Sequence, residues 1–574
     1  MDHDHFKMDT LQVAIELVYQ GCWFLSLDFT DAYYSLAIDP RYRKFLRFQF
    51  EGRLYEFTCC PMGLRTGSRL FTKMLKIPLA HLRENKGVTI SGFLDDTILI
   101  ARSPEEARKG GQLAADLPQD LGYMINKEKS VIRPTTKIEY LGFVIDSQRM
   151  VVGMTETKRL KIKELVAEAC KDEIWSIRRL ASIIGKVSAT GPANNWSKLY
   201  TKRLEIARDE ALRDNGYDYD ARLWITDDCK ADLLWWLDNL DTLERPISMG
   251  NPDYCIFTDA SLEGWGCFDQ QTGTSFGGKW NEIEKDNHIN YLELLAIWFG
   301  LKCVAKDMTN CHIRIRSDNT TAVCCVQKQG SMKSIKSNDL SRQIWNFARE
   351  RTLWLSAQHT PGSENNEADE KSRVFRTETE WSIQDKVFGQ LCKILGTPDI
   401  DLFATRLNHK VPRFCAWQPD PEAESIDAFM SNWGEEPLCY AFPPFAIISR
   451  VLQKIMIDRA EVILVVPFWP TRPWFTRLTE MIVQLPILLP SDNRVLFLFD
   501  SEKQHPLSPK MKLMVAHCSG APGRPEAFRT EWWKHCNGQG GNRPIDCTKE
   551  FTGNGRSFVT NGVWIPCSQM SVKL

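Results

Sequence analysis

Three aspartates stand where a metal-dependent catalytic site would need them. Asp95 and Asp96 lie between two apolar runs of β type, residues 88–90 and 97–100, which is typical of a hairpin. Asp28 also ends an apolar run. Adjacent carboxylates repel one another unless a cation neutralises them, and oxygen-rich groups suit Mg²⁺ or Mn²⁺. We expect Asp28, Asp95 and Asp96 to hold two such ions for an in-line phosphoryl transfer.

Four further acids form a second group in the middle of the chain. Asp259 and Asp318 each end a predicted strand, so their side chains can meet at one sheet edge. Glu293 lies on an apolar helix, where a lone carboxylate is costly unless it is paired or bound to a metal. Asp369 follows the His359-Thr-Pro-Gly loop and opens a late helix. These four carboxylates are predicted to bind a second pair of divalent cations.

The order of short motifs in residues 1–150 resembles the palm of a reverse transcriptase. The motifs are Leu27-Asp28 through Ala32-Tyr33, Pro61-Met62-Gly63-Leu64, Phe93-Leu94-Asp95-Asp96 and Leu141-Gly142-Phe143. The resemblance implies RNA-directed DNA synthesis, with an RNA template, a DNA primer and deoxynucleoside triphosphates as partners.

The same resemblance implies roles for four residues that contact the substrate. Tyr33 would pack beneath the incoming sugar and exclude a 2′-hydroxyl, while Met62 and Gly63 would lie near the templating base pair. Members of the family more often have Phe or Gln at the position of Met62. Lys127 would stand near the leaving pyrophosphate, although a solvated lysine is an alternative interpretation.

The second group of acids resembles the site of a retroelement-type ribonuclease H domain. The similarity extends over nearly the whole of residues 251–375 and implies cleavage of RNA in RNA–DNA hybrids. It also implies that His359 sits on a mobile loop near the product phosphate and takes part in catalysis. A surface histidine without a catalytic role is the alternative interpretation.

The region 376–520 resembles the adenine methyltransferase-like module of DIRS and Ngaro retrotransposons. Phe442 stands where active amino-methyltransferases have Asp or Asn, and no Gly-rich cofactor loop is present. We therefore expect a degenerate Rossmann-like fold that neither transfers methyl groups nor binds S-adenosylmethionine. The order of the three modules resembles a DIRS/Ngaro-type, tyrosine-recombinase element, which implies a separately encoded tyrosine recombinase as a partner.

The chain of 574 residues is long enough for several domains, and the patterns predict a multidomain α/β and α+β protein. The expected parts are a palm with partial fingers (1–150), thumb and connection (151–250), ribonuclease H-like domain (251–375), methyltransferase-like module (376–520) and poorly ordered tail (521–574). In the second part, basic amphipathic helices are predicted after Thr155 and over 174–187. Fewer than thirty residues precede Asp28, so most of the fingers is expected to be missing.

Composition restricts the class of protein further. The net charge of -1 means that any nucleic-acid-binding surface must be local. The 18 cysteines include no Cys-x-x-Cys pair, which argues against a zinc ribbon and against a disulfide framework. No apolar run has the length of a membrane span, and the polar N-terminus is unlike a signal peptide. An intracellular protein, cytoplasmic or nuclear, is predicted.

Three functions are compatible with these patterns. The first is a reverse transcriptase with ribonuclease H activity. The second is a ribonuclease H whose palm only binds template and primer, because the missing fingers leave polymerase activity open. The third is a retroelement structural subunit without activity, against which the full sets of acids argue.

Overall fold

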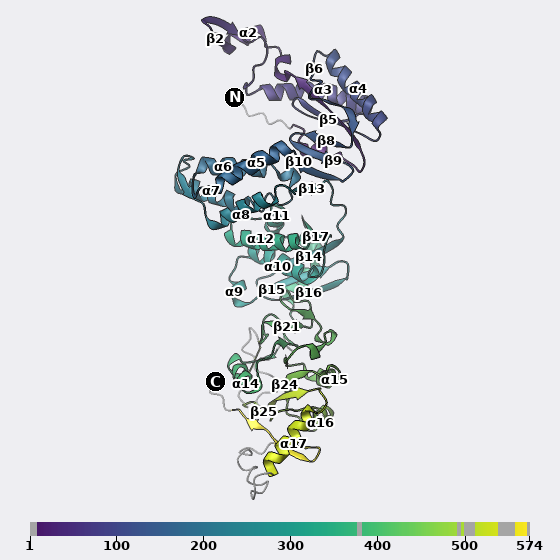
Figure 1. Ribbon diagram of the computed structural model, residues 1–574, viewed down its shortest axis with the longest axis vertical. Helices are drawn as coiled ribbons and strands as arrows, with labels where there is room; N and C mark the ends of the chain where they lie inside the picture. Colours follow the sequence, from purple (N-terminus) through teal and green to yellow (C-terminus); the bar gives the residue numbers. More distant parts are fainter. Residues whose placement is uncertain (1–7, 376–380, 491–494, 499–510, 538–556, 571–574) are drawn as a thin grey trace. The chain divides into compact units, whose positions relative to one another are not determined.

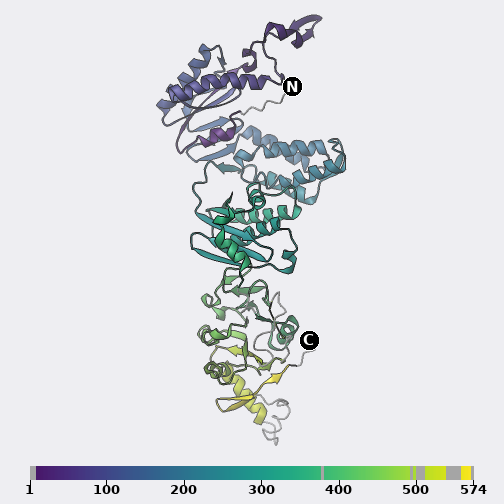
Figure 2. The same ribbon diagram turned by 180° about the vertical axis from the view of Figure 1, so that it is seen from behind.

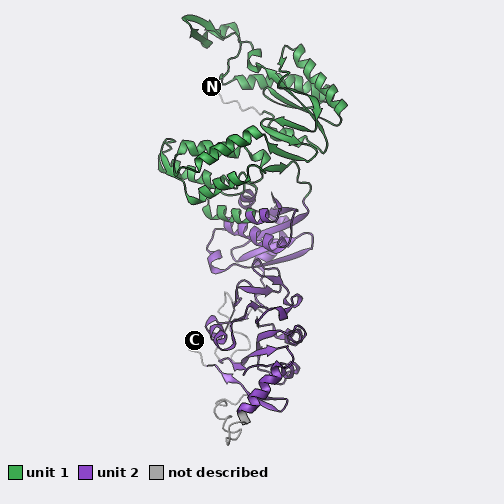
Figure 3. Ribbon diagram, in the orientation of Figure 1, with its two compact units in different colours: residues 1–251, 327–345 green, residues 252–326, 346–574 purple. Residues whose placement is uncertain are grey.

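The computed structural model describes residues 8–375, 381–490, 495–498, 511–537 and 557–570. The chain groups into two compact units, which are Met1–Asn251 with Gln327–Trp345 and Pro252–Val326 with Asn346–Leu574 (Figure 3). Within the described ranges, no helix is both long enough and apolar enough to cross a membrane.

An antiparallel sheet covered by helices forms the palm (Figure 1). Its strands follow the order β4-β5-β1-β6, and β7 also pairs with β1. The elements are α1 (Leu11–Glu16), β1 (Trp23–Thr30), α3 (Gly67–Lys86), β4 (Thr89–Phe93), β5 (Asp96–Ala101), α4 (Pro104–Asp120), β6 (Met124–Ile125) and β7 (Val131–Thr135). Along β1, the buried Leu25, Leu27 and Phe29 join the core beneath α3 and α4. Because side chains alternate along a strand, Asp28 points to the other face.

A separate hairpin carries the basic and aromatic residues of positions 41–57. It consists of β2 (Arg47–Phe50) and β3 (Arg53–Glu56), preceded by the short helix α2 (Pro40–Arg43), and it projects from the palm in Figures 1 and 2. Every residue of both strands is exposed. Arg41 and Arg47 form ion pairs with the exposed acids Asp39 and Glu56.

Helices dominate residues 155–240, after a small sheet of order β13-β10-β9-β8. The elements are β8 (Lys137–Tyr140), β9 (Phe143–Asp146), β10 (Val151–Met154), α5 (Glu156–Ala169), β11 (Ile174–Ser176), α6 (Ile177–Ser188), α7 (Lys202–Asp214), β12 (Arg222–Trp224), α8 (Asp227–Asn239) and β13 (Glu244–Pro246). The predicted cap is confirmed, since the Thr155 hydroxyl accepts a hydrogen bond from the Lys158 amide. The helix predicted from residue 174 begins three residues too early, because Ser176 caps α6 and β11 pairs with β12.

Residues 327–345 group with the first unit, although the sequence predicts one continuous domain over 251–375. The guanidinium of Arg342 forms an ion pair with Asp232 of α8, whose side chain is fully buried. Gln329 accepts a hydrogen bond from the Leu199 amide and donates one to the Asn195 carbonyl. The predicted domain is therefore interrupted, because contacts distant in sequence hold this segment elsewhere.

The part predicted to be ribonuclease H-like contains a five-stranded sheet of order β16-β15-β14-β17-β18. Strands β14, β17 and β18 are parallel, and β15 and β16 return antiparallel beside β14. The elements are β14 (Tyr254–Ala260), β15 (Gly264–Asp269), β16 (Thr274–Lys279), α9 (Glu282–Lys285), α10 (Ile289–Val304), β17 (His312–Ser317), α11 (Thr320–Gln327), α12 (Ile335–Glu350), β18 (Trp354–His359) and α13 (Asn366–Arg373).

An eight-stranded sheet of order β22-β21-β20-β23-β24-β27-β25-β30 organises the C-terminal module. Strands β20 to β24 are parallel, whereas β27 runs antiparallel to both of its neighbours. The elements up to β27 are β19 (Trp381–Ile383), α14 (Asp385–Leu395), β20 (Ile400–Asp401), β21 (Arg413–Ala416), β22 (Ser425–Ile426), β23 (Cys439–Ala441), α15 (Ile448–Asp458), β24 (Glu461–Pro467), α16 (Pro473–Glu480), β25 (Ile487–Leu488), β26 (Leu496–Leu498) and β27 (Leu513–Ser519).

The described part of residues 521–574 is folded, so the predicted poorly ordered tail is wrong there. It forms α17 (Arg524–Asn537), β28 (Ser557–Thr560), β29 (Val563–Pro566) and β30 (Ser568–Gln569). Strand β30 pairs with β25 at the edge of the large sheet, and Cys567 joins its core. Backbone pairing at a sheet edge is a tertiary contact that local composition does not report. The Gly- and Asn-rich stretch 538–556 lies outside the described residues.

Candidate active sites

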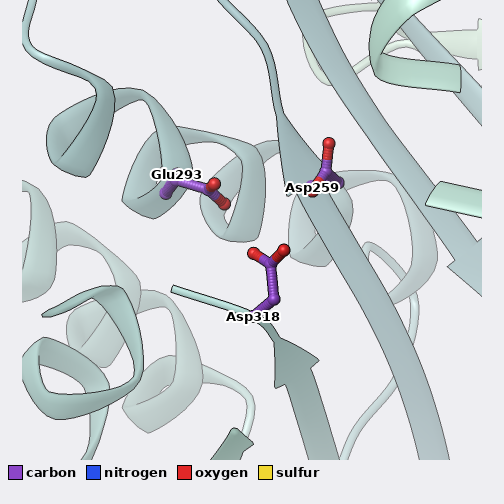
Figure 4. A group of neighbouring side chains, drawn as sticks. All are labelled: Asp259, Glu293 and Asp318. Carbon is purple, nitrogen blue, oxygen red and sulfur yellow. The ribbon is translucent and has the colours of Figure 1, made fainter. Parts of the chain in front are cut away.

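Three of the four predicted ribonuclease acids meet at one place. Asp259 lies near the end of β14, Glu293 lies in α10, and Asp318 directly follows β17 (Figure 4). One ligand oxygen from each lies within 4.8 Å of the other two. Among the described residues, this is the one group of three or more acids, histidines or cysteines that meets this criterion. Parallel pairing of β14 with β17 explains the convergence, because both strands end at the same sheet edge.

Burial makes these carboxyl groups hard to ionise. Asp259 and Glu293 are only 4% and 5% exposed, and Asp318 is the more exposed member. Burial, followed by the charges of Asp259 and Asp318, raises the pKa of Glu293 to about 9. Burial also raises the pKa of Asp259 to about 6, against the opposing hydrogen bond from Ser372. The site therefore favours protonation of its carboxyl groups or binding of a cation, because either neutralises the negative charge.

This donor set fits a divalent cation. Oxygen Oε2 of Glu293 is buried and has no hydrogen-bond partner within the described ranges of the chain. A buried acceptor without a partner is destabilising, and a cation among three carboxylates would satisfy it. Hard oxygen ligands are those preferred by Mg²⁺ and Mn²⁺.

Two polar residues that the sequence analysis missed hold Asp259 in place. The Ser372 hydroxyl donates to Oδ2 of Asp259 at 2.7 Å, and the Asn365 amide donates to Oδ1 at 3.4 Å. The same Asn365 amide donates to the Thr258 carbonyl at 3.1 Å. Ser372 is 0% exposed and Asn365 is 1% exposed. Asn365 directly precedes α13 and Ser372 lies within it, so both are close in sequence to the predicted Asp369. Only the fold shows that this helix faces β14.

The fourth predicted acid and the predicted histidine are not members of this close group. Asp369 in α13 is not part of the close cluster, and its Oδ1 accepts from Arg373 at 2.7 Å. His359 is exposed and is the last residue of β18, paired opposite Ser317. The prediction that His359 sits on a mobile loop is therefore wrong, because strand pairing extends to this residue. Its catalytic role stays a prediction.

The palm acids are brought to one end of the sheet. Asp28 in β1 pairs directly opposite Asp96 in β5, and Asp95 lies in the turn between β4 and β5. Leu94 adopts φ +53° in this turn. A positive φ is typical of a central residue in the tight turns that join hairpin strands. The Phe29 amide donates to the Asp95 carbonyl at 2.9 Å. The three carboxylates do not all approach within the 4.8 Å found in the other group.

Burial and neighbouring charges raise the pKa of two of the palm acids, Asp28 and Asp96. Burial raises the pKa of Asp96 to about 6, and the charges of Asp95 and Asp28 add to this. The pKa of Asp28 is raised by burial as well, and Lys129 opposes both shifts. Lys129 is therefore a lysine whose charge acts on these acids. The role of Lys127 near the leaving pyrophosphate stays a prediction. Lys127 is exposed.

The other residues predicted to contact the substrate are Tyr33, Met62 and Gly63, and they differ in burial and in backbone conformation. Tyr33 follows β1, and its hydroxyl is 2.9 Å from the Ser68 hydroxyl of α3. Its ring packs edge-on against Phe71 with ring centroids 6.1 Å apart. Met62 is 69% exposed. Gly63 adopts φ +89°, a backbone conformation that side-chain-bearing residues rarely adopt.

Comparison with known proteins finds a family match over the part of the chain that contains Asp28, Asp95 and Asp96. Residues 2–145 match the family model described as "Reverse transcriptase (RNA-dependent DNA polymerase)". The chain is 22% identical over 313 residues to the "Retrovirus-related Pol polyprotein from transposon gypsy" of Drosophila melanogaster, a match covering 52% of this chain and 28% of that protein. It is 27% identical over 210 residues to the "Pol polyprotein" of Feline endogenous virus ECE1, covering 33% and 20% respectively.

One solved structure matches this chain with low sequence identity and a low TM-score. It is the foamy viral protease-reverse transcriptase in complex with dsDNA, at 16% identity and a TM-score of 0.38, covering 63% of this chain and 72% of that one. The chain spans less than a third of the length of the two Pol polyproteins. The similarity of residues 2–145 is therefore to reverse transcriptase domains, and the two matched relatives are retrotransposon and retroviral Pol polyproteins.

Proposed function

We propose that this chain is a retroelement reverse transcriptase that also cleaves the RNA strand of RNA–DNA hybrids. Each reaction would be a two-metal phosphoryl transfer at its own group of acids. The family match of residues 2–145 supports the polymerase. The observation that carries the ribonuclease is the convergence of Asp259, Glu293 and Asp318 around a buried, unpartnered carboxyl oxygen.

In the palm, the residues of the chain position the cations and the nucleotide. Asp28 and Asp96 face each other across paired strands, and Asp95 adds a third carboxylate. Bound Mg²⁺ ions would stabilise the charge on the attacking and leaving oxygens. Lys129 contributes positive charge beside the acids. Tyr33 is tethered to α3, so that its ring would exclude a ribose from the site of the deoxynucleoside triphosphate.

In the ribonuclease H-like domain, the residues of the chain provide a negatively charged, preorganised cradle. Asp259 is fixed by Ser372 and Asn365, while Glu293 is held by its packed helix. Cation binding would require Glu293 to release its proton, because its pKa lies well above neutral. The half-buried Asp369 and the exposed His359 lie beside this edge, where an RNA–DNA hybrid would approach.

The C-terminal module is proposed to be a methyltransferase-like fold without methyl transfer, as in DIRS and Ngaro elements. The single reversed strand β27 within an otherwise parallel order supports this fold. Residues 402–405, which follow β20, include no glycine, and Phe442 follows β23. A DIRS/Ngaro origin would make a separately encoded tyrosine recombinase the partner of this chain.

The test measures primer extension and hybrid cleavage on the same full-length preparations. Changing Asp95 and Asp96 together to Asn should abolish extension and leave cleavage, whereas Asp318→Asn should do the reverse. Loss of a metal ligand is expected to lower the rate by roughly a thousandfold or more. Asp31→Asn and Glu367→Gln are matched controls, because both acids are near but outside the two groups. If both activities fell together in either variant, two separate sites would be excluded.

A second candidate function is a ribonuclease H whose palm only binds template and primer. It is favoured by one difference, namely that the palm acids are not gathered as closely as the ribonuclease acids. Cleavage by the wild-type chain without any primer extension, together with retained binding of template and primer, would select this function.

A further inference from the structure

A buried arginine of the C-terminal module is bound to the ribonuclease H-like domain, within the same compact unit. Arg406 lies in the loop after β20, and its side chain is only 4% exposed. Its guanidinium donates to both carboxylate oxygens of Glu284 in α9, at 2.9 and 2.8 Å. It also donates to the carbonyl of Lys279, the last residue of β16. The buried charge is thus paired entirely with groups of the other domain, as a guanidinium out of water requires.

Glu284 is also held from within its own domain. Its carboxylate accepts a hydrogen bond from the Asn281 amide at 2.8 Å, and the Asn281 side chain accepts one from the Glu284 amide at 2.8 Å. This capping box begins α9 and fixes the orientation of the carboxylate. The two parallel hydrogen bonds from Arg406 therefore meet a rigid partner, which is the arrangement in which an arginine–carboxylate pair is strongest.

A chain of hydrogen bonds leads from this contact to the candidate metal ligand Asp259. Trp280 follows Lys279 and is 0% exposed, and its Nε1 donates to the Ser261 carbonyl at 2.9 Å. The Ser261 hydroxyl donates to the Ser372 carbonyl. Ser372 in turn donates its own hydroxyl to Oδ2 of Asp259 at 2.7 Å. A displacement at the end of β16 would therefore reach the carboxylate through groups that have hydrogen-bond partners at every step.

The same guanidinium lies over α10, the helix that carries Glu293 (Figure 4). The central carbon of the Arg406 guanidinium is 4.8 Å from the centroid of the Phe299 ring, which is within the range of a cation–π contact. Phe299 is 3% exposed and packs against Trp280, with ring centroids 5.8 Å apart. Arg406 thus contacts both parts of the frame, one that leads to Asp259 and one that carries Glu293.

A second contact anchors the end of α10 to the module. Lys306 lies two residues beyond this helix, and its ammonium group donates to the carbonyls of Ala423 and Glu424. Both carbonyls belong to the segment that leads into β22. The module therefore holds α10 at its end as well as along its side.

We propose that the C-terminal module holds the ribonuclease site in its cation-binding geometry, and that Arg406 is the positioning residue through which it does so. The inference rests on the proposed ribonuclease function and gives the module a role that requires no ligand of its own. Asp259 and Glu293 repel one another when both are ionised, so a frame must keep them close. Arg406 contributes to that frame through Trp280 and Phe299. Groups that orient metal ligands change metal affinity although they do not touch the metal.

The experiment compares Arg406→Met with the wild type in the full chain. Methionine retains an apolar stem but removes the ion pair. Hybrid cleavage is measured against the concentrations of Mg²⁺ and of hybrid. The variant should raise the Mg²⁺ concentration for half-maximal cleavage by about tenfold, with KM for the hybrid and primer extension unchanged. Arg413→Met is the matched control, because Arg413 is an arginine of the same module that pairs inside the module, with Glu424 and Glu436.

Two further variants separate positioning from a general loss of folding. Arg406→Lys keeps the charge without the bidentate geometry, so it should recover only part of the Mg²⁺ affinity. Glu284→Gln keeps an acceptor for the Asn281 amide but removes the charge, so it should reproduce the shift seen in Arg406→Met. Combining the two changes should add little, because both remove one interaction. Circular dichroism and thermal unfolding would show that the variants are folded, and Glu284→Gln carries the test if Arg406→Met is not.

Binding of Mn²⁺, followed by electron paramagnetic resonance, tests the inference without relying on cleavage. The background is the Asp95→Asn, Asp96→Asn chain, in which the candidate ligands of the palm are removed. The binding that Asp318→Asn abolishes there belongs to the ribonuclease group, and Arg406→Met should weaken it by about tenfold. Weakened Mn²⁺ binding in a chain whose wild type cleaves no hybrid would reject the proposed function and still support the positioning role. Unchanged Mn²⁺ affinity in Arg406→Met, or an equal shift in Arg413→Met, would overturn the inference.

Discussion

Among single residues, Glu293 combines burial, like-charged neighbours and an unpartnered oxygen. Its pKa of about 9 lies above that of the unfolded chain, so the folded state holds the proton more tightly. This stabilising effect is complete below the unfolded pKa and is lost as pH rises toward about 9. Glu293→Gln does not titrate. In excess chelator, the wild type should therefore lose stability relative to this variant by up to about 1.4 kcal/mol per pH unit.

The measurement is the difference in unfolding free energy between the two proteins from pH 5 to pH 9. Adding Mg²⁺ should flatten the difference for the wild type, because the cation replaces the proton. A difference that does not change with pH would show that Glu293 is ionised in the folded chain, contrary to the pKa assigned to it.

Ser372 is predicted to position Asp259 without touching the substrate. Ser372→Ala removes the 2.7 Å hydrogen bond and should let the carboxylate turn away. Residues that orient metal ligands typically change metal affinity by 10- to 100-fold. We expect the Mg²⁺ concentration for half-maximal cleavage to rise by about tenfold, with hybrid affinity unchanged. Ser363→Ala, an exposed serine before α13, serves as the control, and an unaltered Mg²⁺ requirement in Ser372→Ala would contradict the assignment.

At the scale of elements, the segment after β1 and the helix α3 together fix the ring of Tyr33, which is proposed to face the sugar. Tyr33→Ala should allow incorporation of ribonucleotides, because the ring that would overlap the 2′-hydroxyl is gone. Tyr33→Phe keeps the ring but loses the contact with the Ser68 hydroxyl, so it should retain the preference for deoxynucleotides. Primer extension with each class of nucleotide measures the ratio. An equal preference in the Ala variant and the wild type would remove Tyr33 from this role.

For the whole molecule, Asp232 and Arg342 join segments more than a hundred residues apart within the first unit. Asp232 has no exposed side-chain surface, and burial raises its pKa while Arg342 lowers it. Removing only one partner leaves a buried charge, which typically costs about 3–5 kcal/mol. Arg342→Met should therefore destabilise the first unit strongly, whereas Arg342→Met combined with Asp232→Leu should recover most of the loss.

Denaturant unfolding of the full chain, followed by tryptophan fluorescence, would measure this cycle. The exposed pair Arg178 and Asp220 offers a comparison, since Arg178→Ala should have little effect on stability. If the double variant were as unstable as Arg342→Met, the buried ion pair itself, rather than the unpaired charge, would hold residues 327–345 to the unit.

Much of the candidate sites follows from local sequence. Apolar runs ending in Asp28, Asp95, Asp259 and Asp318 specify strands, and strand ends place carboxylates at sheet edges. Glu293 is recognisable because a lone acid in an apolar helix needs a partner. The ordered motifs of residues 1–150 indicated a resemblance to reverse transcriptases, and residues 2–145 match that family model. These features are encoded within about a dozen residues each, so no tertiary information is required.

Other features depend on contacts between residues far apart in the chain. Only the fold shows that Ser372 faces Asp259, that Lys129 acts on the palm acids, and that residues 327–345 group with the first unit. It also decides that β30 completes a sheet edge where composition predicted disorder. The types and spacing of residues determine strands, helices and candidate ligands, because those depend on local periodicity. Burial, pKa and the choice among nearby polar residues depend on through-space packing, which the tertiary structure alone decides.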